Sequence, residues 1–293
     1  MDRRDFIKSG LKAGVATGIA ASFGSSAIAA KLSANNNFVF VKGGLPDEMF
    51  DTGIAILGGI ERFVSKGDNV AIKPDMSTDS YPEQGKTTHP LLVKQIIKSC
   101  YEAGARKVLV FDHTYGLWTK CYKDSGIERI AKDAYARVLP ANNQRYYSEQ
   151  QSTKPDKLRS VKIHNALIQA DTFINVPILK YDPATKISAS LKNLMGCVWD
   201  REFYKKNGLD QCIAEFLYYK KPQLTILDAY FTSSGNRKIK SQIITTDIVA
   251  ADAFGARLLG FTPDNIGHIM KAAQLGFGKI TAGNMNVKPV DIG

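Results

Sequence analysis

The stretch DTFINVPILKYDPATKISASLKNLMGCVW, Asp171–Trp199, decides the fold class. The apolar run Thr172–Leu179 predicts a buried strand that ends in Lys180. A polar loop follows, and the chain then reaches a second lysine in Lys192-Asn193. Open α/β sheets present ligand-binding groups at the carboxyl ends of their strands. Two lysines and an amide around one turn therefore favour a pocket for an anion. Solvated lysines on a loop are the alternative.

Apolar runs alternate with helical patterns along the rest of the chain. Between residues 69 and 112 the pattern predicts a strand at 69–73, a helix at 91–102 and a strand at 107–112. Such a unit makes two parallel strands joined by a right-handed crossover. The other strands are predicted at 38–41, 136–139, 161–164, 223–228 and 239–244, the other helices at 47–64, 126–135, 166–170, 209–219, 248–259 and 262–273, and a polar excursion at 141–155.

The sequence therefore predicts an α/β fold with a mostly parallel central sheet and helices on both faces, in Rossmann-like layers. At 293 residues the chain is long enough to bury a substantial core. We predict a single large domain over residues 38–293, preceded by a linker at 30–37.

The net charge of +11 favours anionic partners: nucleic acid, anionic lipid or anionic small molecules. Blocks of Lys and Arg, or basic residues interleaved with aromatic ones, do not occur, which argues against nucleic acid. A basic surface for anionic lipid stays open as an alternative to a defined pocket, and it predicts strong salt dependence.

The first 29 residues have the pattern of a twin-arginine signal peptide. Arg3-Arg4 is followed by Phe6, an aliphatic residue and Lys8, then by a weakly apolar Gly- and Ala-rich stretch and the small-residue site Ala27-Ile28-Ala29. This stretch is too short and too weakly hydrophobic for a stable membrane anchor. We expect a soluble periplasmic protein that is exported folded, with the twin-arginine translocase as a partner during export.

The four cysteines fit no metal or disulfide pattern. Cys100, Cys121, Cys197 and Cys212 form no C-x-x-C pair, and their spacing matches no standard zinc or ferredoxin site. A disulfide is permitted in the predicted compartment, but the spacing does not say which cysteines would pair.

Polar residues gather where predicted strands end. These residues should converge on the carboxyl edge of the sheet, and they are Lys73, Asp75, Asp112, His113, Lys180 and Asp228. Thr88 and His89 begin the helix that returns from the same edge, with Pro90 in its first turn. His89 and His113 are candidates for proton transfer or metal binding, and the acids could hold a divalent metal. Histidines at a helix start are also commonly structural, so both roles stay open.

The order of the motifs IKPDM, TTHPLLVKQII, EAGARKVLVFD, DTFINVPILK, SLKNLMG, LTILDA and TTDIVAADAFGARLLG resembles the family called domain of unknown function 362. That family is prokaryotic, often associated with iron–sulfur proteins, and has no settled activity. Its usual K-P-N is replaced by Lys73-Pro74-Asp75, and its usual K-T-H by Lys180-Tyr181-Asp182. The second change puts in doubt any metal or proton-transfer role at position 182. Many members carry a ferredoxin module; it is absent here, so the resemblance implies no intrinsic iron–sulfur cluster.

A weaker resemblance concerns the Thr-His-Pro helix start and the Ala-Gly bend and strand after it. These are similar to the amino-terminal region of nickel-pincer lactate racemases, which suggests a small hydroxy-acid-like anion as the ligand.

Four common catalytic or nucleotide-binding motifs are missing from the sequence. They are the G-x-S-x-G elbow, the P-loop, H-E-x-x-H, and G-x-G-x-x-G after a strand.

The sequence thus predicts binding of a small anionic ligand at the carboxyl edge. Lys73, Lys180 and Lys192 would neutralise the ligand, Asn193 would hydrogen-bond it, and Asp75 and Thr88 would complete the site. In an oxidoreductase- or racemase-like enzyme, His113 or His89 would transfer the proton, oriented by Asp112 or Asp75. The alternative is a non-catalytic protein that holds a metal or cofactor, or assists maturation, for an exported redox partner.

Overall fold

The computed structural model describes residues 37–232, 237–281 and 289–293. The predicted signal peptide and all of the predicted linker but Asn37 lie outside these residues. The described chain is organised around one eight-stranded sheet, with strand order β12-β1-β11-β10-β7-β2-β3-β4. These strands are β1 (Phe38–Lys42), β2 (Asn69–Pro74), β3 (Lys107–Val110), β4 (Arg137–Val138), β7 (Thr172–Val176), β10 (Leu224–Thr232), β11 (Arg237–Thr245) and β12 (Val290–Asp291).

The sheet is mostly parallel, as predicted. The neighbours β10 and β7, β7 and β2, β2 and β3, and β3 and β4 are all parallel pairs. Only β11 runs antiparallel to its neighbours β1 and β10, while β12 pairs with β1 in parallel. The predicted fold class is therefore confirmed.

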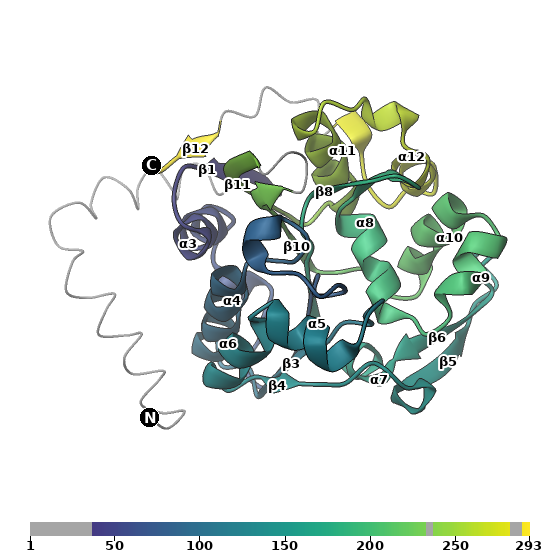
Figure 1. The fold of residues 1–293 in the computed structure, drawn as a ribbon, viewed down its shortest axis with the longest axis horizontal. Coiled ribbons are helices and arrows are strands. Elements are labelled where there is room, and N and C mark those ends of the chain that lie inside the picture. Colours follow the sequence, from purple (N-terminus) through teal and green to yellow (C-terminus); the bar gives the residue numbers. More distant parts are fainter. Residues whose placement is uncertain (1–36, 233–236, 282–288) are drawn as a thin grey trace, which may run out of the picture.

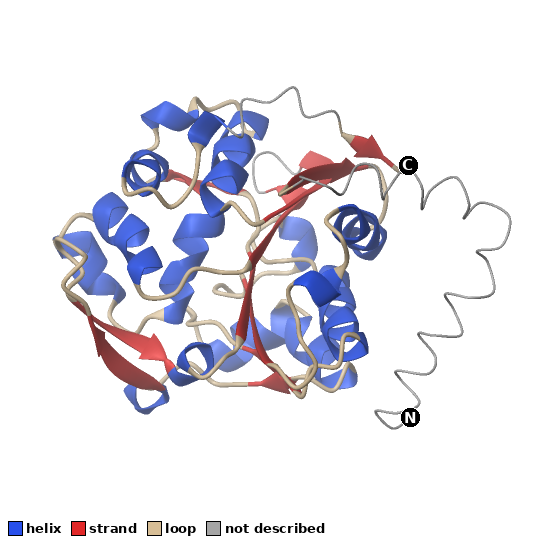
Figure 2. Cartoon of the chain, turned by 180° about the vertical axis from the view of Figure 1, so that it is seen from behind, coloured by secondary structure: helices blue, strands red, loops and turns tan. Residues whose placement is uncertain are grey.

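Helices cover both faces of this sheet (Figures 1 and 2). They are α3 (Pro46–Ile56), α4 (Pro90–Glu102), α5 (Trp118–Asp124), α6 (Ile127–Asp133), α7 (Asn165–Ile168), α8 (Ser190–Asn193), α9 (Arg201–Lys206), α10 (Leu209–Glu215), α11 (Ile248–Leu258) and α12 (Gly267–Gln274). Among the described residues, none of the helices has the length and apolar character needed to cross a membrane.

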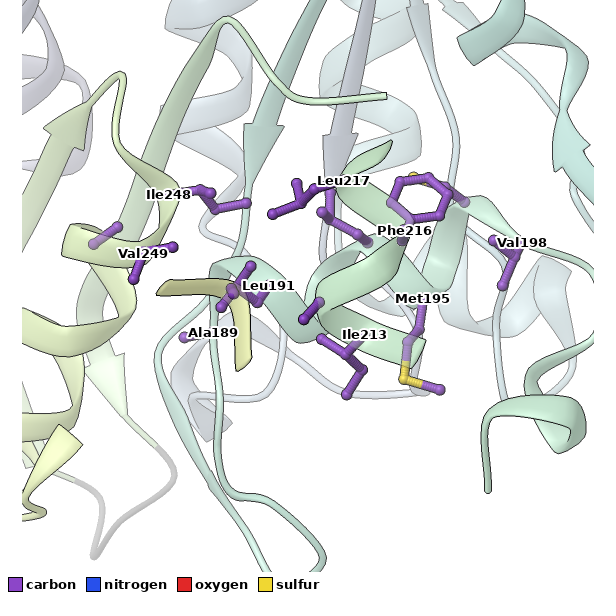
Figure 3. Close-up of a cluster of buried hydrophobic side chains, with 14 of the residues drawn as sticks. Ala189, Leu191, Met195, Val198, Ile213, Phe216, Leu217, Ile248 and Val249 are labelled. Atoms are coloured by element: carbon purple, nitrogen blue, oxygen red, sulfur yellow. The ribbon is translucent and has the colours of Figure 1, made fainter. Parts of the chain in front are cut away.

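Alternate residues of the central strands enter two separate cores. Val70 and Ile72 pack with α3, α4 and α6 on one face, whereas Ala71 packs with α8, α10 and α11 on the other. Such alternation follows from the period of two along a strand that is buried on both faces. Figure 3 shows Leu191 and Met195 of the SLKNLMG motif beside Ile213 in the second core. The motif is thus anchored by its apolar residues, and its polar residues are left to face the sheet edge.

The structure also corrects several predicted boundaries. β7 ends at Val176 and not at Leu179, because Pro177 has no N–H to donate. Lys180 belongs instead to β8 (Lys180–Asp182), which pairs with β9 (Lys186–Ser188) outside the main sheet. The polar excursion contains a strand, β5 (Tyr147–Gln151), paired with β6 (Ser160–His164). The helix predicted at 262–273 is a short 3₁₀ turn, Pro263–Asn265, followed by α12.

Candidate functional site

A cleft of about 270 Å³ lies at the carboxyl edge of β2, β3 and β7, and we call it the carboxyl-edge cleft. Seven of the nine predicted site residues line it, and Thr88 and His89 do not. Its lining comprises Lys73, Asp75, Ser77, Thr78, Lys86, Asp112, His113, Tyr115, Lys180, Tyr181, Asp182, Ser188, Lys192, Asn193, Met195, Gly196 and Arg201. The strand-end residues Lys73, Asp75, Asp112, His113 and Lys180 therefore lie together, whereas Asp228, predicted with them, does not line the cleft.

The floor of the cleft is a buried ion pair. Lys73, which is 1% exposed, places Nζ 2.7 Å from Asp112 Oδ1. The same ammonium donates to Asn193 Oδ1 at 2.6 Å and to the Pro74 carbonyl at 2.9 Å. The other Asp112 oxygen, Oδ2, accepts from the Met76 backbone N–H at 2.9 Å. Lys73 thus makes two hydrogen bonds within the protein, and Asp112 already balances its charge, so its expected role of neutralising a ligand is corrected.

Gly196 lies in the 3₁₀ turn Leu194–Cys197 directly after α8, and it lets this turn approach the ion pair. A Cβ built on Gly196 would lie 2.0 Å from Asp112 Oδ1 and 2.4 Å from Lys73 Cε. Real Cβ atoms do not come so close to other heavy atoms, so any side chain here would push the pair apart. The glycine at the end of SLKNLMG is therefore required by close packing against the floor of the cleft.

An amide network ties α8 to the sheet. Asn193 Nδ2 donates to the Lys73 carbonyl at 3.1 Å and to Asn175 Oδ1 at 2.8 Å. Asn175 Nδ2 in turn donates to the Ser190 carbonyl at 2.9 Å. Asn175 was not among the predicted site residues, although a polar residue within the apolar run FINVPIL was a signal. Asn193 holds the floor together, and its side chain is not free for a ligand.

Two further lysines pair with acids along the walls. Lys180 Nζ lies 2.7 Å from Asp75 Oδ2, and Lys192 Nζ lies 2.5 Å from Asp182 Oδ2. Burial alone would raise the pKa of Asp75, but the ammonium groups of Lys180 and Lys73 outweigh it and the pKa is lowered. For Asp182 too, Lys192 outweighs burial and lowers the pKa. Both carboxyls are therefore ionised at neutral pH.

Two cationic residues of the lining, Lys86 and Arg201, were not predicted. Among the described residues, neither has a carboxylate partner. Lys86 is exposed on the loop after β2. Arg201 donates from Nη1 to the His113 carbonyl at 3.1 Å and from Nη2 to the Thr114 carbonyl at 2.7 Å. Its guanidinium lies 3.8 Å from the centre of the Tyr115 ring. No motif distinguishes these two cations, and only the fold brings them to the cleft.

His113, which lines the same cleft, has one unprotonated ring nitrogen. Its Nδ1 lies 2.8 Å from the Val198 carbonyl, which can only accept, so Nδ1 carries the proton and Nε2 keeps a lone pair. Burial, followed by the nearby Arg201, lowers the pKa of His113 to about 4. The ring stacks on Trp199, with centroids 5.2 Å apart. His113 is therefore neutral at pH 7 and held in a fixed orientation.

His89 and Thr88 play other parts, and their predicted place in the site is corrected. The His89 N–H donates to Asp228 Oδ2 at 2.8 Å, and its Nδ1 accepts from Leu91 N at 3.3 Å, so His89 caps α4. Thr88 Oγ1 donates to the Val176 carbonyl at 2.6 Å and accepts from the Asp75 N–H at 2.8 Å. Both residues support the loop after β2 without lining the cleft.

Asp228 lies within β10 and not at its end, because the strand continues to Thr232. Its carboxylate accepts from the backbone N–H groups of His89 and Tyr230. Burial raises the pKa of Asp228 to about 6. This acid connects β10 to the start of α4, and it does not line the cleft.

The start of α8 is capped by an acid from a distant helix. Asp252 of α11 accepts from Ser190 N at 2.6 Å and from Leu191 N at 2.9 Å. Behind it, His268 Nε2 lies 3.9 Å from Asp252 Oδ2, and His268 Nδ1 lies 3.3 Å from Asp210 Oδ1. A helix of four residues has little stability of its own, so this buried cap fixes the segment that carries Lys192 and Asn193.

The cysteines are divided between the two faces of the sheet. Cys100 and Cys121 lie in the core with α4, whereas Cys197 and Cys212 lie in the core with α8. The four thiols therefore do not form the ligand set of an iron–sulfur cluster. In the described part of the chain, no group of three or more His, Cys, Asp or Glu side chains is arranged to hold a metal ion.

Comparison with known proteins identifies the family. A thylakoid-associated protein of Synechocystis sp. is 24% identical over 241 residues, which cover 77% of this chain and 74% of that protein. A solved protein from Thermotoga maritima has a TM-score of 0.50 at 12% identity, over 80% of this chain and 60% of that one. The lactate racemase apoprotein from Thermoanaerobacterium thermosaccharolyticum has a TM-score of 0.48 at 12% identity, over 75% and 56%. The chain thus spans less than two thirds of both solved chains, and at this identity the likeness concerns the fold alone.

The model of the family described as domain of unknown function (DUF362) matches residues 70–257. The match contains β3, β7, α8 and all of β2 except Asn69, and these elements together build the carboxyl-edge cleft. It covers more than half of the sequence, as the motif order predicted, and the chain therefore belongs to the DUF362 family.

Proposed function

We propose that this chain binds a small oxyanion, a carboxylate or a phosphate, in the carboxyl-edge cleft. One observation carries the proposal: the lining has five cationic and three acidic side chains, and each acid is already paired with a lysine. Lys86 and Arg201 are the two cations of the lining without a carboxylate partner among the described residues, and we call them the surplus cations. Clefts lined by an excess of one charge concentrate ligands of the opposite charge.

Arg201 is the residue best placed to bind the oxyanion. Its two bonds to the His113 and Thr114 carbonyls orient the guanidinium, and its other N–H groups have no acceptor in the described part of the chain. A planar guanidinium with parallel N–H groups matches the geometry of a carboxylate or phosphate. Lys86 adds charge from the loop after β2, with the flexibility of an exposed lysine.

We further propose that His113 exchanges a proton with the bound ligand, as in a racemase- or oxidoreductase-like enzyme. The lone pair on Nε2 is the group that would accept the proton, and the Val198 carbonyl holds Nδ1–H in place. An anion bound beside His113 favours the protonated ring, so the pKa of His113 should rise on binding.

Removing the surplus cations should weaken anion binding. We expect Arg201→Gln to reduce affinity for acetate and for inorganic phosphate by roughly tenfold or more, because a charge-assisted hydrogen bond contributes about 1.5–3 kcal/mol. Lys86→Gln should cost less, about threefold, because an exposed ion pair contributes less than about 1 kcal/mol. Chemical-shift titrations by NMR measure both.

Arg137→Gln is the matched control, since Arg137 lines a separate cleft at the amino edge of the sheet. Its affinities should equal those of the wild type. Equal affinity in the wild type and in Arg201→Gln would refute the assignment of the anion to this cleft.

Anion affinity should also depend on pH through His113. In the free protein the pKa of His113 is about 4, and a bound anion raises it, so by linkage the affinity increases as pH falls toward that value. The affinity should begin to increase where the pH falls to the His113 pKa of the bound state, and it should level off only below the free-state value of about 4. Methanesulfonate is the probe, since its own charge does not change over this range.

His113→Gln should abolish the increase at low pH while leaving the affinity at neutral pH within about threefold of the wild type. An affinity that has already levelled off near pH 6.5 in the wild type would contradict the depressed pKa of His113 in the free protein.

We also propose export through the twin-arginine pathway, supported by Arg3-Arg4 and the small-residue site that follows. Replacing both arginines by lysine should keep the charge and reduce the periplasmic fraction at least tenfold, measured by fractionation and immunoblotting. An unchanged periplasmic fraction would exclude this route.

A further inference from the structure

Large apolar side chains are exposed mainly at one edge of the molecule. Among the described residues, the six most exposed large hydrophobic side chains include Tyr81, Tyr115, Leu117 and Tyr181, at 60, 58, 68 and 52%. All four follow β2, β3 or β7, on the segments that leave the carboxyl edge of the sheet. Exposed apolar residues scattered singly are ordinary, whereas a group around a cleft marks a binding surface.

Two of these rings line the carboxyl-edge cleft itself: Tyr115 and Tyr181. The Tyr115 backbone N–H donates to the Ser77 carbonyl at 2.8 Å, and the Arg201 guanidinium covers one face of its ring. Tyr181 stacks on Phe261, with centroids 6.2 Å apart and ring planes 18° apart. Both rings are therefore held in place on one side while more than half of each side chain faces solvent.

The cleft thus combines a charged floor with an aromatic rim. The volume of the cleft is about 270 Å³, just below the range of about 300–1,000 Å³ that is typical of pockets for drug-sized ligands. A ligand of this size carries a single ring or a short apolar chain beside its charged group. A second aromatic ring gains from contact with Tyr115 or Tyr181 both by burial of apolar area and by ring stacking.

We infer that the ligand of the carboxyl-edge cleft is an aromatic oxyanion, with the charged group near Arg201 and the ring against Tyr115 and Tyr181. This inference rests on the proposed function, since it assigns the substrate class of the same site. The charges alone do not distinguish one anion from another. The two tyrosines select among anions by the apolar part of each anion.

The test compares matched pairs of anions that share a charged group: phenylacetate with acetate, and phenyl phosphate with inorganic phosphate. For the wild-type full-length chain, we expect the aromatic anion to bind roughly tenfold more tightly than its partner in the pair whose charged group fits the cleft. The difference comes from burial of the apolar area of one ring. Cyclohexylacetate separates stacking from simple burial: an affinity between those of acetate and phenylacetate indicates that stacking contributes. The carboxylate and phosphate pairs together identify the charged group.

Tyr181→Ala is the most informative variant, because in the described part of the chain the Arg201 guanidinium lies over Tyr115 and hydrogen-bonds to His113 and Thr114, and not to Tyr181. It should reduce the preference for phenylacetate roughly fivefold while leaving acetate affinity unchanged, and Tyr181→Phe should restore the preference. Tyr115→Ala should also reduce it, with some loss of acetate affinity through Arg201. Tyr146→Ala is the control, since Tyr146 also carries an arginine over its ring, at 4.9 Å, but lines the cleft at the amino edge.

The outcomes separate this inference from the proposed function. Equal affinities within each pair, with weaker binding in Arg201→Gln, would overturn the aromatic class and leave anion binding intact. A preference that neither tyrosine variant changes would also overturn the inference. No binding of any probe would overturn both.

Discussion

Replacing Gly196 by alanine is expected to destabilise the fold by about 3–5 kcal/mol, the cost of breaking a buried ion pair, and to abolish anion binding. The new Cβ would lie 2.0 Å from Asp112 Oδ1, so either the carboxylate or the turn after α8, and α8 with it, must move. Moving the carboxylate separates it from Lys73, and moving α8 removes Asn193 from the same ammonium. Chemical denaturation monitored by circular dichroism measures the loss, and an NMR titration with acetate measures binding.

Gly116→Ala provides the control for this prediction. Gly116 is exposed, and its added Cβ would meet only Cys121 Sγ, at 3.2 Å. The free energy of unfolding should change by less than about 1 kcal/mol, in the range of ordinary surface substitutions. A Gly196→Ala protein as stable as Gly116→Ala would show that the floor of the cleft can rearrange.

Replacing Lys73 by methionine should cost about 3–5 kcal/mol of folding free energy, because Asp112 would stay buried without its counter-charge. Burial already raises the pKa of Asp112, and removing the Lys73 ammonium raises it further. A carboxyl whose folded pKa exceeds its unfolded pKa destabilises the native state above the unfolded value. The deficit of Lys73→Met relative to wild type should therefore shrink as the pH is lowered toward 5.

The double variant Lys73→Met/Asp112→Asn tests the cause. A neutral amide needs no counter-charge and can still accept from the Met76 N–H, so the double variant should recover at least half of the loss. Additive losses in the double-mutant cycle would mean that Lys73 and Asp112 act independently.

The sequence predicted the sheet well because the signals for strands buried on both faces are local. The apolar runs around Val70, Val108 and Ile174 alternate with helices, and such runs make parallel neighbours almost regardless of the loops. The prediction of strands failed where a strand is polar and exposed. β5 has the sequence YSEQQ and is largely exposed, so it lacks the apolar period that marks a strand.

The position of the candidate site was predicted, but the pairing of its lysines with its acids was not. That strand ends meet at one edge follows from topology, and Lys73, Asp112 and Lys180 do meet there. Which lysine faces which acid depends on the reach of side chains from loops far apart, such as Lys180 and Asp75, which are 105 residues apart. Local patterns hold no information about such contacts. For the same reason, nothing in the sequence marked Arg201 as a cleft residue.

The pairing of β1 also determines the order in which the molecule can be assembled. β1 enters the sheet only through β11 and β12, with Phe38 opposite Thr245. During synthesis the first described strand therefore has no partner until more than 200 further residues have emerged. Asp252, which caps α8, follows β11 in the sequence, so this support of the cleft is synthesised after every strand of the sheet except β12. Such late, long-range contacts slow folding and make it cooperative. A nascent chain of this protein therefore passes most of its synthesis without a supported carboxyl-edge cleft.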